Sequence, residues 1–210
     1  MRRWFLIIFA VFAMAQEDLL IKIAPDISYV TVMHRGIKIK VMRNQDPEHL
    51  LLDDYSKTSR PCPPFCIHPI KLEGIKTIAT LEMVKFLRDK VNSGKGVVVD
   101  ARLPSWYKAE TIPSAINIPF VIFEKIDRKK AEKIFKLLGM EVKNGRWDFS
   151  QAKEIAVFCN GVWCDQSRRL IEPMIQLGYP KEKIYWYRNG MQGWKLLGLT
   201  TVVQKVNKAK

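Results

Sequence analysis

Hydrophobic and polar residues alternate on both sides of a short turn near the N-terminus. Residues 27–43 read ISYVTVMHRGIKIKVMR, two β-branched runs separated by Arg35 and Gly36. Alternation with a period of two gives a strand one inner and one outer face, and a short glycine-containing turn joins two such strands in an antiparallel pair. The pattern predicts a β-hairpin.

Further along, short continuous apolar runs alternate with segments of helical periodicity. The runs at residues 96–100, 155–158 and 183–187 are typical of strands that a parallel sheet buries on both faces. The residues expected to begin or end the helices are Thr80, Asp127 and Ser167 at the N-termini, and residues 92–94, Gly139 and Gly178 at the C-termini. Alternating strands and helices predict an α/β fold with a parallel sheet flanked by helices.

Proline interrupts this regularity between the hairpin and the sheet. Residues 61–69 read PCPPFCIHP, and four prolines in nine residues exclude a helix or a central strand. We therefore expect a small N-terminal β module with a cysteine-bearing connector at residues 16–74, an α/β domain at residues 75–204, and a basic tail at residues 205–210.

The first 15 residues have the order of a secretory signal peptide. Arg2 and Arg3 precede an apolar run at residues 4–14, and residues 13–15, Ala-Met-Ala, form a small-x-small cleavage site. A membrane-spanning helix needs about 20 apolar residues, so an uncleaved interfacial anchor is the weaker alternative. The short apolar run also fits the general secretory route better than a twin-arginine signal. We expect a periplasmic or secreted protein with no stable membrane insertion after cleavage.

Composition and charge narrow the classes of partner. The chain has 210 residues, 48% of them hydrophobic and 27% charged, which fits a globular protein and excludes a disordered tail. Lys and Arg outnumber Asp and Glu by 35 to 21, a formal net charge of +14 that raises nucleic acids, anionic membranes and small anions as partners. Because no nucleic-acid-binding module is recognised, we do not expect a nucleic-acid partner.

A cysteine stands at the carboxyl end of the second predicted strand. Ligands of open parallel sheets bind at this edge, where Cys159 and the turn of residues 160–166 precede the helix at Ser167. Backbone amides and a helix N-terminus favour the thiolate, which is the nucleophilic form. Gly161 allows the turn to aim its amides inward as an anion-binding nest. The sequence predicts a cysteine nucleophile beside an oxyanion pocket.

Three stretches resemble the signatures of the rhodanese family of sulfurtransferases, in the family's order and spacing. They are VVVDAR and IPSAINIP at residues 97–102 and 112–119, AVFC at residues 156–159 with Ser167 downstream, and YRNGMQGW at residues 187–194. The resemblance covers roughly residues 75–203. It implies the rhodanese-like α/β fold, a parallel sheet flanked by helices and here preceded by the hairpin module.

The resemblance implies a transfer of sulfane sulfur in two steps, without a metal or a cofactor. Cys159 would attack the outer sulfur of a donor such as thiosulfate, become a persulfide, and pass the sulfur to a thiol or cyanide acceptor. The partners implied are a small sulfur-containing anion, such an acceptor, and a periplasmic thiol protein. The residues implied in substrate binding are Asn160, Gly161, Val162, Trp163, Asp165, Gln166 and Arg168.

The loop departs from the family pattern in length and charge. Seven residues lie between Cys159 and Ser167, where the family usually has five. Phosphatases built on this fold need an arginine six residues after the cysteine, and that position is Asp165 here. A carboxylate in an anion cradle opposes phosphate, so we do not expect a phosphatase.

A second cysteine in the same loop leaves alternatives open. Three roles are open for Cys164: a resolving thiol for the Cys159 persulfide, a disulfide partner of Cys159 in an oxidising compartment, or a buried residue without a chemical role. A permanent disulfide would make the protein a non-catalytic rhodanese-like binding module, and a reversible one would make it a dithiol redox protein.

The other two cysteines, Cys62 and Cys66, lie in one rigid turn. We expect them to form a local structural disulfide that staples the connector. One alternative is a metal site with His68 and a further histidine. Another is that the pair exchanges electrons or sulfur with Cys159.

Three features have expected structural roles. Asp100 and Arg102, at the end of a predicted strand, are expected to order the neighbouring loops by hydrogen bonds. Trp194 is expected to pack the C-terminal helix on the core. The basic tail at residues 205–210 reads as a solvated end.

Overall fold

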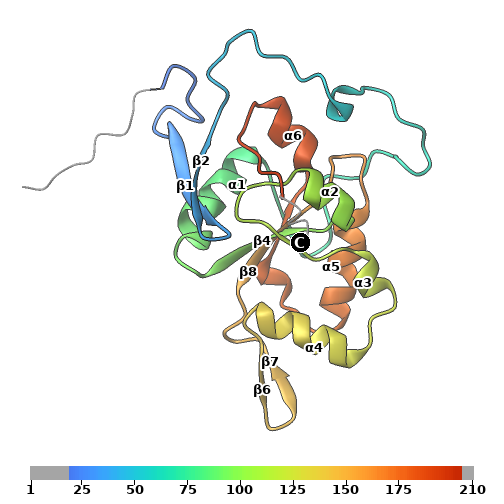
Figure 1. Cartoon of the computed structure of the whole chain (residues 1–210). Coiled ribbons are helices and arrows are strands. Elements are labelled where there is room, and N and C mark those ends of the chain that lie inside the picture. Colours follow the sequence, from blue (N-terminus) through green and yellow to red (C-terminus); the bar gives the residue numbers. More distant parts are fainter. Residues whose placement is uncertain (1–18, 205–210) are drawn as a thin grey trace, which may run out of the picture.

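The centre of the protein is a five-stranded sheet in which all neighbouring strands are parallel (Figure 1). The computed structural model describes residues 19–204, so the predicted signal peptide and basic tail lie outside the described residues. In spatial order the strands are β3 (Lys76–Ile78), β9 (Ile184–Tyr187), β8 (Glu154–Phe158), β4 (Gly96–Asp100) and β5 (Ile116–Asn117). The predicted fold class and its three main strands are confirmed.

Helices cover both faces of the sheet, because each face presents buried aliphatic side chains that need an apolar partner layer. The first face packs on α1 (Thr80–Phe86), its π-helical continuation η2 (Leu87–Val91) and α6 (Gly190–Leu196). The second face packs on α3 (Val121–Glu124), α4 (Arg128–Leu137) and α5 (Gln166–Gln176). Trp194 is fully buried in the first layer, as expected. None of the helices within residues 19–204 has the length and apolarity required to cross a membrane.

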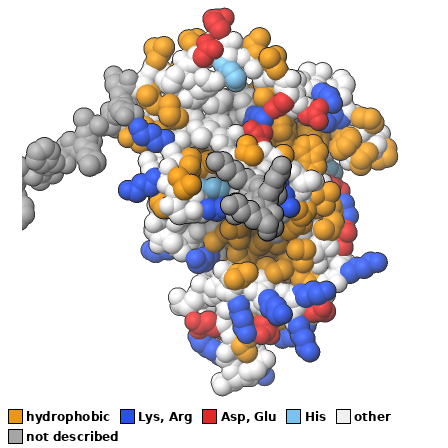
Figure 2. Space-filling view, in the orientation of Figure 1, with side chains coloured by type: hydrophobic (Ala, Val, Ile, Leu, Met, Phe, Trp, Pro, Cys, Tyr) orange, Lys and Arg blue, Asp and Glu red, His pale blue; other side chains and the backbone are white. Residues whose placement is uncertain are grey.

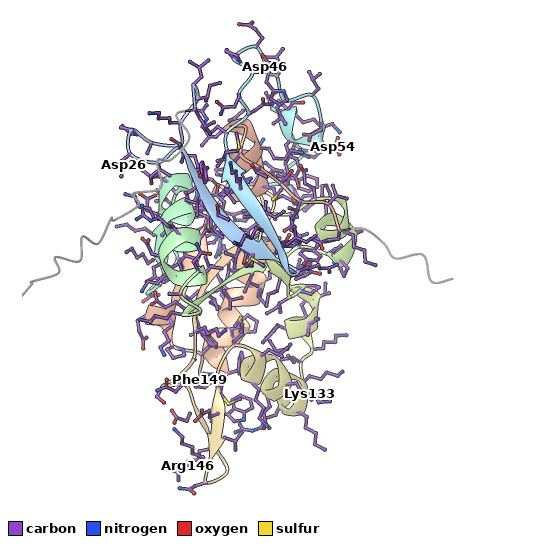
Figure 3. The ribbon with its side chains drawn as sticks, turned by 60° about the vertical axis from the view of Figure 1, so that its left-hand side comes forward. Asp26, Asp46, Asp54, Lys133, Arg146 and Phe149 are labelled. Atoms are coloured by element: carbon purple, nitrogen blue, oxygen red, sulfur yellow. A yellow bond between two sulfur atoms is a disulfide. The ribbon has the colours of Figure 1, made fainter. Side chains whose placement is uncertain are left out.

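The predicted hairpin is present and completes the first layer. β1 (Tyr29–His34) pairs antiparallel with β2 (Ile37–Met42), and Arg35 and Gly36 form the turn with positive φ angles. Val32 and Val41 lie in the same buried cluster as residues of α1 and α6. Figures 1 and 3 show the hairpin beside α1. The hairpin therefore has no separate core, and its apolar face is buried against the α/β domain.

The ends of the helices follow the expected chemistry with two differences. Asp127 caps α4 by accepting a 2.8 Å hydrogen bond from the Lys130 N–H. Thr80 does not cap α1, which was a wrong prediction: it is the first helical residue, and its hydroxyl lies 3.0 Å from that of Tyr187. The capping position is Ala79, whose N–H donates to the side chain of Glu82. Helix α5 begins at Gln166, one residue before the predicted start.

Several short elements were not predicted. The structure adds the hairpin of β6 (Glu141–Lys143) and β7 (Arg146–Asp148), which projects from the body with Arg146 at its tip (Figure 3). Rings of Trp147 and Phe149 at its base pack on Phe135 of α4, with centroids 5.6 and 5.4 Å away. The remaining short helices are η1 (Asp54–Ser56), α2 (Pro104–Ala109) and η3 (Lys181–Lys183).

Candidate active site around Cys159

Cys159 directly follows β8, the middle strand of the sheet, and is 2% exposed. Its thiol donates to the carbonyl of Cys164 at 3.2 Å, and its Sγ lies 3.3 Å from the Ser167 Oγ. The indole N–H of Trp186 donates to that same Oγ at 2.9 Å. Because Trp186 occupies a lone pair of the hydroxyl, the hydroxyl proton is free to point at the sulfur. Ser167 is thus placed as a hydrogen-bond donor to Cys159.

The surroundings of Cys159 favour its thiolate. Burial raises the pKa of the thiol, but hydrogen bonds from the Cys164 thiol, the Ser167 hydroxyl and the N–H groups of Ser167 and Gly161 outweigh burial and lower it. For Cys164, burial and the neighbouring Cys159 both raise the pKa well above its usual value. Of the two free thiols, Cys159 is therefore the one that deprotonates first.

The start of α6 fixes the backbone of the cysteine. The N–H groups of Met191 and Gln192 donate to the carbonyls of Cys159 and Asn160 at 3.0 and 2.8 Å. Gly190 has a φ of +57°, and a Cβ there would collide with the Cys159 carbonyl oxygen. The position therefore requires glycine.

Side chains of the loop residues mainly hold the loop in place. Asn160 accepts hydrogen bonds from the Tyr55 hydroxyl and from Arg102, at 2.9 and 3.3 Å. The indole N–H of Trp163 donates to the Gln192 side chain at 2.7 Å. The side-chain oxygen of Asn160 and the indole N–H of Trp163 are thus engaged within the protein.

The other residues expected to bind substrate lie at the start of α5. Asp165 and Gln166 are half-buried, and the side-chain oxygen of Gln166 has no hydrogen-bond partner within residues 19–204. Arg168 is half-buried, with a guanidinium nitrogen 3.4 Å from the Nδ1 of His68. Arg168 also pairs with Glu172 at 3.5 Å, and the neighbouring Arg169 pairs with Glu124.

A buried ion pair lies next to the Cys159 loop and contacts Asn160. Arg102 and Asp100 have fully buried side chains that meet at 2.6 Å. Arg102 also donates to the Tyr55 hydroxyl at 2.8 Å, and the Thr111 hydroxyl donates to Asp100 at 2.8 Å. The pair orders the neighbouring segments by hydrogen bonds, as its sequence position suggested.

Helix α4, away from the Cys159 loop, carries a group of exposed positive charges. Lys129, Lys130, Lys133 and Lys136 are exposed on α4, at the lower end of the space-filling view (Figure 2). The cations near the Cys159 loop are engaged with the connector, because Arg188 donates to the carbonyls of His68 and Pro69 at 2.5 and 3.3 Å.

Tyr55, His68 and Gln192 contact the loop but were not identified from the sequence. Tyr55 and His68 lie about a hundred residues before the loop; Tyr55 carries no motif, and His68 was considered only as a ligand of a metal site. Gln192 falls inside the third signature stretch without being singled out. Cys62 and Cys66 are joined as a disulfide, which leaves no thiolate for the metal site considered above.

The comparisons with known proteins agree with this geometry. A family model described as the rhodanese-like domain matches residues 83–197, more than half of the chain. The chain belongs to the rhodanese-like domain family. No curated protein sequence matches it.

Three solved structures are similar to part of this chain. A thiosulfate sulfurtransferase from Pseudomonas aeruginosa is 21% identical, with a TM-score of 0.42, and the match covers 63% of this chain and 21% of that one. A human single-domain sulfurtransferase is 19% identical, with a TM-score of 0.40, over 57% of this chain and 94% of that one. The BH2092 protein from Bacillus halodurans is 20% identical, with a TM-score of 0.44, and the match covers 64% of this chain and 82% of that one.

Proposed function

We propose that the protein is a sulfurtransferase in which Cys159 carries sulfane sulfur as a persulfide. The observation that carries the proposal is the position of the Cys159 sulfur after the middle strand, with the Ser167 hydroxyl at 3.3 Å and a lowered pKa. Membership of the rhodanese-like family supports the same reaction class.

In the first step, the Cys159 thiolate attacks the outer sulfur of thiosulfate or a similar donor. A sulfur–sulfur bond forms on Cys159 while the bond to the leaving group breaks, and sulfite departs with the electron pair. In the second step, a thiolate or cyanide attacks the outer sulfur, and the electron pair returns to Cys159. Ser167 and the loop amides that stabilise the thiolate make Cys159 a good leaving group in this step.

Two neighbours complete the proposed site. Arg168 supplies a half-buried positive charge for the sulfur-containing anion. Cys164 stays protonated next to Cys159 because its pKa is raised. We further propose that the protein acts in the periplasm or outside the cell, with a thiol protein of that compartment as an acceptor; the signal-peptide pattern of residues 1–15 supports this proposal.

The test is mass spectrometry of the reduced protein after treatment with thiosulfate. We expect a gain of one sulfur atom on the peptide that contains Cys159, its loss on addition of cyanide, and no gain in Cys159→Ser. Cys164→Ser is the matched control and should still load sulfur. No adduct after reduction, together with a Cys159–Cys164 bond that resists reductant in the folded protein, would instead identify a disulfide-locked binding module.

A further inference from the structure

The connector lies directly on the Cys159 loop. The N–H of His68 donates to the carbonyl of Val162 at 3.0 Å. The Phe65 ring meets the Trp163 ring edge-on, with centroids 5.5 Å apart, and the Arg60 guanidinium lies 4.0 Å from the Trp163 ring centroid. We call residues 60–69 the cover segment.

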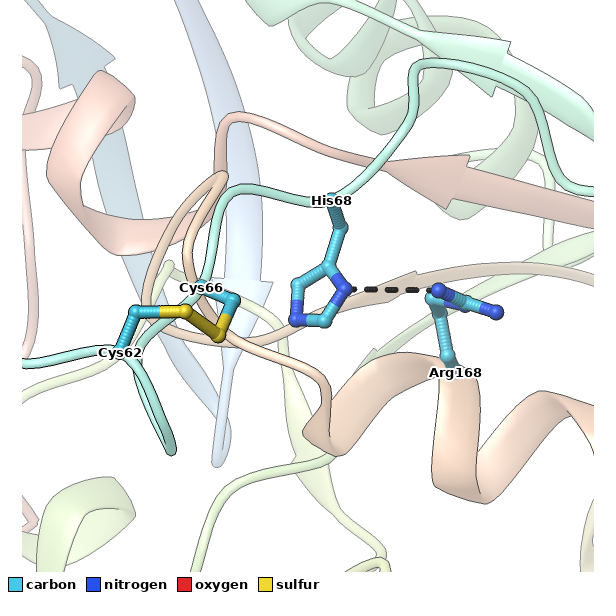
Figure 4. Close-up of a disulfide and its surroundings, with 4 residues drawn as sticks. All are labelled: Cys62, Cys66, His68 and Arg168. Atoms are coloured by element: carbon cyan, nitrogen blue, oxygen red, sulfur yellow. Dashed lines mark hydrogen bonds between the residues drawn. A yellow bond between two sulfur atoms is a disulfide. The ribbon is translucent and has the colours of Figure 1, made fainter.

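Hydrogen bonds and ring contacts at the surface hold the cover segment on the domain. Besides the contacts above, Arg60 donates to the Asp54 carbonyl and Arg188 donates to the carbonyls of His68 and Pro69. None of its residues belongs to the buried hydrophobic clusters of the described chain. Its internal order comes from the Cys62–Cys66 disulfide and from a 2.9 Å bond between the Phe65 N–H and the Pro61 carbonyl. Figure 4 shows His68 between this disulfide and Arg168 of α5.

Access to sulfur differs sharply between the two cysteine pairs. Cys159 is 2% and Cys164 is 5% exposed, so a reagent in solution reaches the Cys159 sulfur only after the residues around it have moved. Cys62 is exposed and Cys66 is half-buried. A thiol from solution therefore meets the Cys62–Cys66 disulfide first, and exposed disulfides are the ones that exchange.

We propose that the Cys62–Cys66 disulfide is a thiol–disulfide exchange site for a protein dithiol, and that its reduction releases the cover segment and opens Cys159. Loss of the covalent ring leaves the segment with only the surface contacts described above. This inference concerns access to Cys159 and does not depend on sulfur transfer.

The exchange takes place in two balanced steps. A thiolate of the dithiol attacks the exposed sulfur of Cys62; a mixed disulfide forms as the Cys62–Cys66 bond breaks, and Cys66 leaves as a thiolate. The second thiol of the reductant then attacks its own sulfur in the mixed disulfide, and Cys62 leaves as a thiolate. The cystine gains two electrons and two protons, which the dithiol loses as it becomes a disulfide.

The surface beside the disulfide suits a protein partner. Phe65 and Ile67 flank Cys66 in the chain and are 38% and 80% exposed. Apolar side chains next to a reducible bond allow a dithiol protein to dock while its thiolate reaches Cys62.

The experiment measures the alkylation rate of Cys159 in the full chain by peptide mass spectrometry. The protein is compared before and after treatment with dithiothreitol, with the reductant removed before alkylation, and beside the Cys62→Ser/Cys66→Ser double variant. All measurements are repeated in a Cys164→Ser background, so that a Cys159–Cys164 bond cannot produce the effect of reductant. Phe65→Ala, which keeps the disulfide, is compared with Ile67→Ala.

We expect reduction, the double variant and Phe65→Ala each to raise the alkylation rate of Cys159 by about tenfold or more. An effect of this size is expected when a ring contact and a hydrogen bond no longer hold the segment in place. Dithiothreitol should add nothing in the double variant, and Ile67→Ala should behave as the parent. Equal Cys159 rates before and after reduction, or a Cys62–Cys66 bond that resists dithiothreitol in the folded protein, would overturn the inference. If reduction speeds the alkylation of Cys159 but the protein takes up no sulfur from thiosulfate, the inference about access holds and only the proposed sulfurtransferase function is rejected.

Discussion

The hydroxyl of Tyr55 donates a 2.9 Å hydrogen bond to the side chain of Asn160, the residue next to Cys159, across a separation of 105 residues in the chain. Arg102 donates to the same hydroxyl at 2.8 Å. Burial raises the pKa of Tyr55, so the hydroxyl keeps its proton and remains a donor to Asn160. A residue that precedes the matched family domain thus holds the loop that carries the cysteine.

Tyr55→Phe removes this link without changing the ring. We expect the free energy of unfolding to fall by about 1–3 kcal/mol, because a buried Arg102 N–H and the Asn160 oxygen each lose one hydrogen-bond partner and keep only the longer bond between them. The loop should also loosen, with faster alkylation of Cys159. Denaturant unfolding and alkylation rates measure both effects. Tyr185→Phe removes a hydroxyl that bonds Glu154 instead, and an equal effect of this variant on Cys159 would contradict the prediction.

The ion pair of Asp100 and Arg102 should show strong coupling. Arg102→Leu leaves the Asp100 carboxylate buried without its cation, which costs about 3–5 kcal/mol of unfolding free energy. Replacing both residues by leucine removes both charges and should cost clearly less than the sum of the single changes. A double-mutant cycle by guanidinium unfolding measures the coupling, and simple additivity would show that the two side chains act independently.

The N-terminal hairpin should contribute to the stability of the whole domain. Val32 lies in the cluster that also contains residues of α1 and α6, so we expect Val32→Ala to lower the free energy of unfolding by about 2 kcal/mol. Val142→Ala, at an exposed position of the β6–β7 hairpin, should change it by less than about 0.5 kcal/mol. In denaturant unfolding we expect one transition, which Val32→Ala shifts and Val142→Ala does not. A separate transition for the hairpin would argue against a core shared with the domain.

The reactivity of Cys159 should depend on Ser167 through pH. Because the pKa of Cys159 is lowered, the thiolate persists to lower pH, and alkylation should reach half its maximal rate below about pH 8.5, the usual value for cysteine. In Ser167→Ala the midpoint should rise by about one pH unit, since one hydrogen bond to a charged group is lost. Reduced protein alkylated across the pH range gives both curves, with Ser150→Ala as an exposed control. An unchanged midpoint in Ser167→Ala would show that its hydroxyl does not stabilise the sulfur anion.

The sheet and its main helices could be predicted because their signals are local. Residues 96–100 and 155–158 are continuous apolar runs of strand length, and Asp127 stands where a cap is needed. β3 and β5, by contrast, are three and two residues long. Elements this short carry no periodicity and exist only because a neighbouring strand pairs with them.

The site could be predicted only in part, for a similar reason. The position of Cys159 after a buried strand, before a glycine-containing turn, is visible in sequence. The contacts of Tyr55 and His68 with the loop join segments about a hundred residues apart, and no sequence pattern encodes such a pairing. The contact of the cover segment with the Cys159 loop is a pairing of the same kind and was therefore not foreseen.

The hydrogen bonds from Met191 and Gln192 to the carbonyls of Cys159 and Asn160 also bear on the order in which the site is assembled during folding. Strands β4, β8 and β9 all precede α6 in the chain. Until α6 docks, the carbonyls of Cys159 and Asn160 lack these two backbone partners. The loop that carries the cysteine is thus completed only when the C-terminal end of the domain has folded onto it.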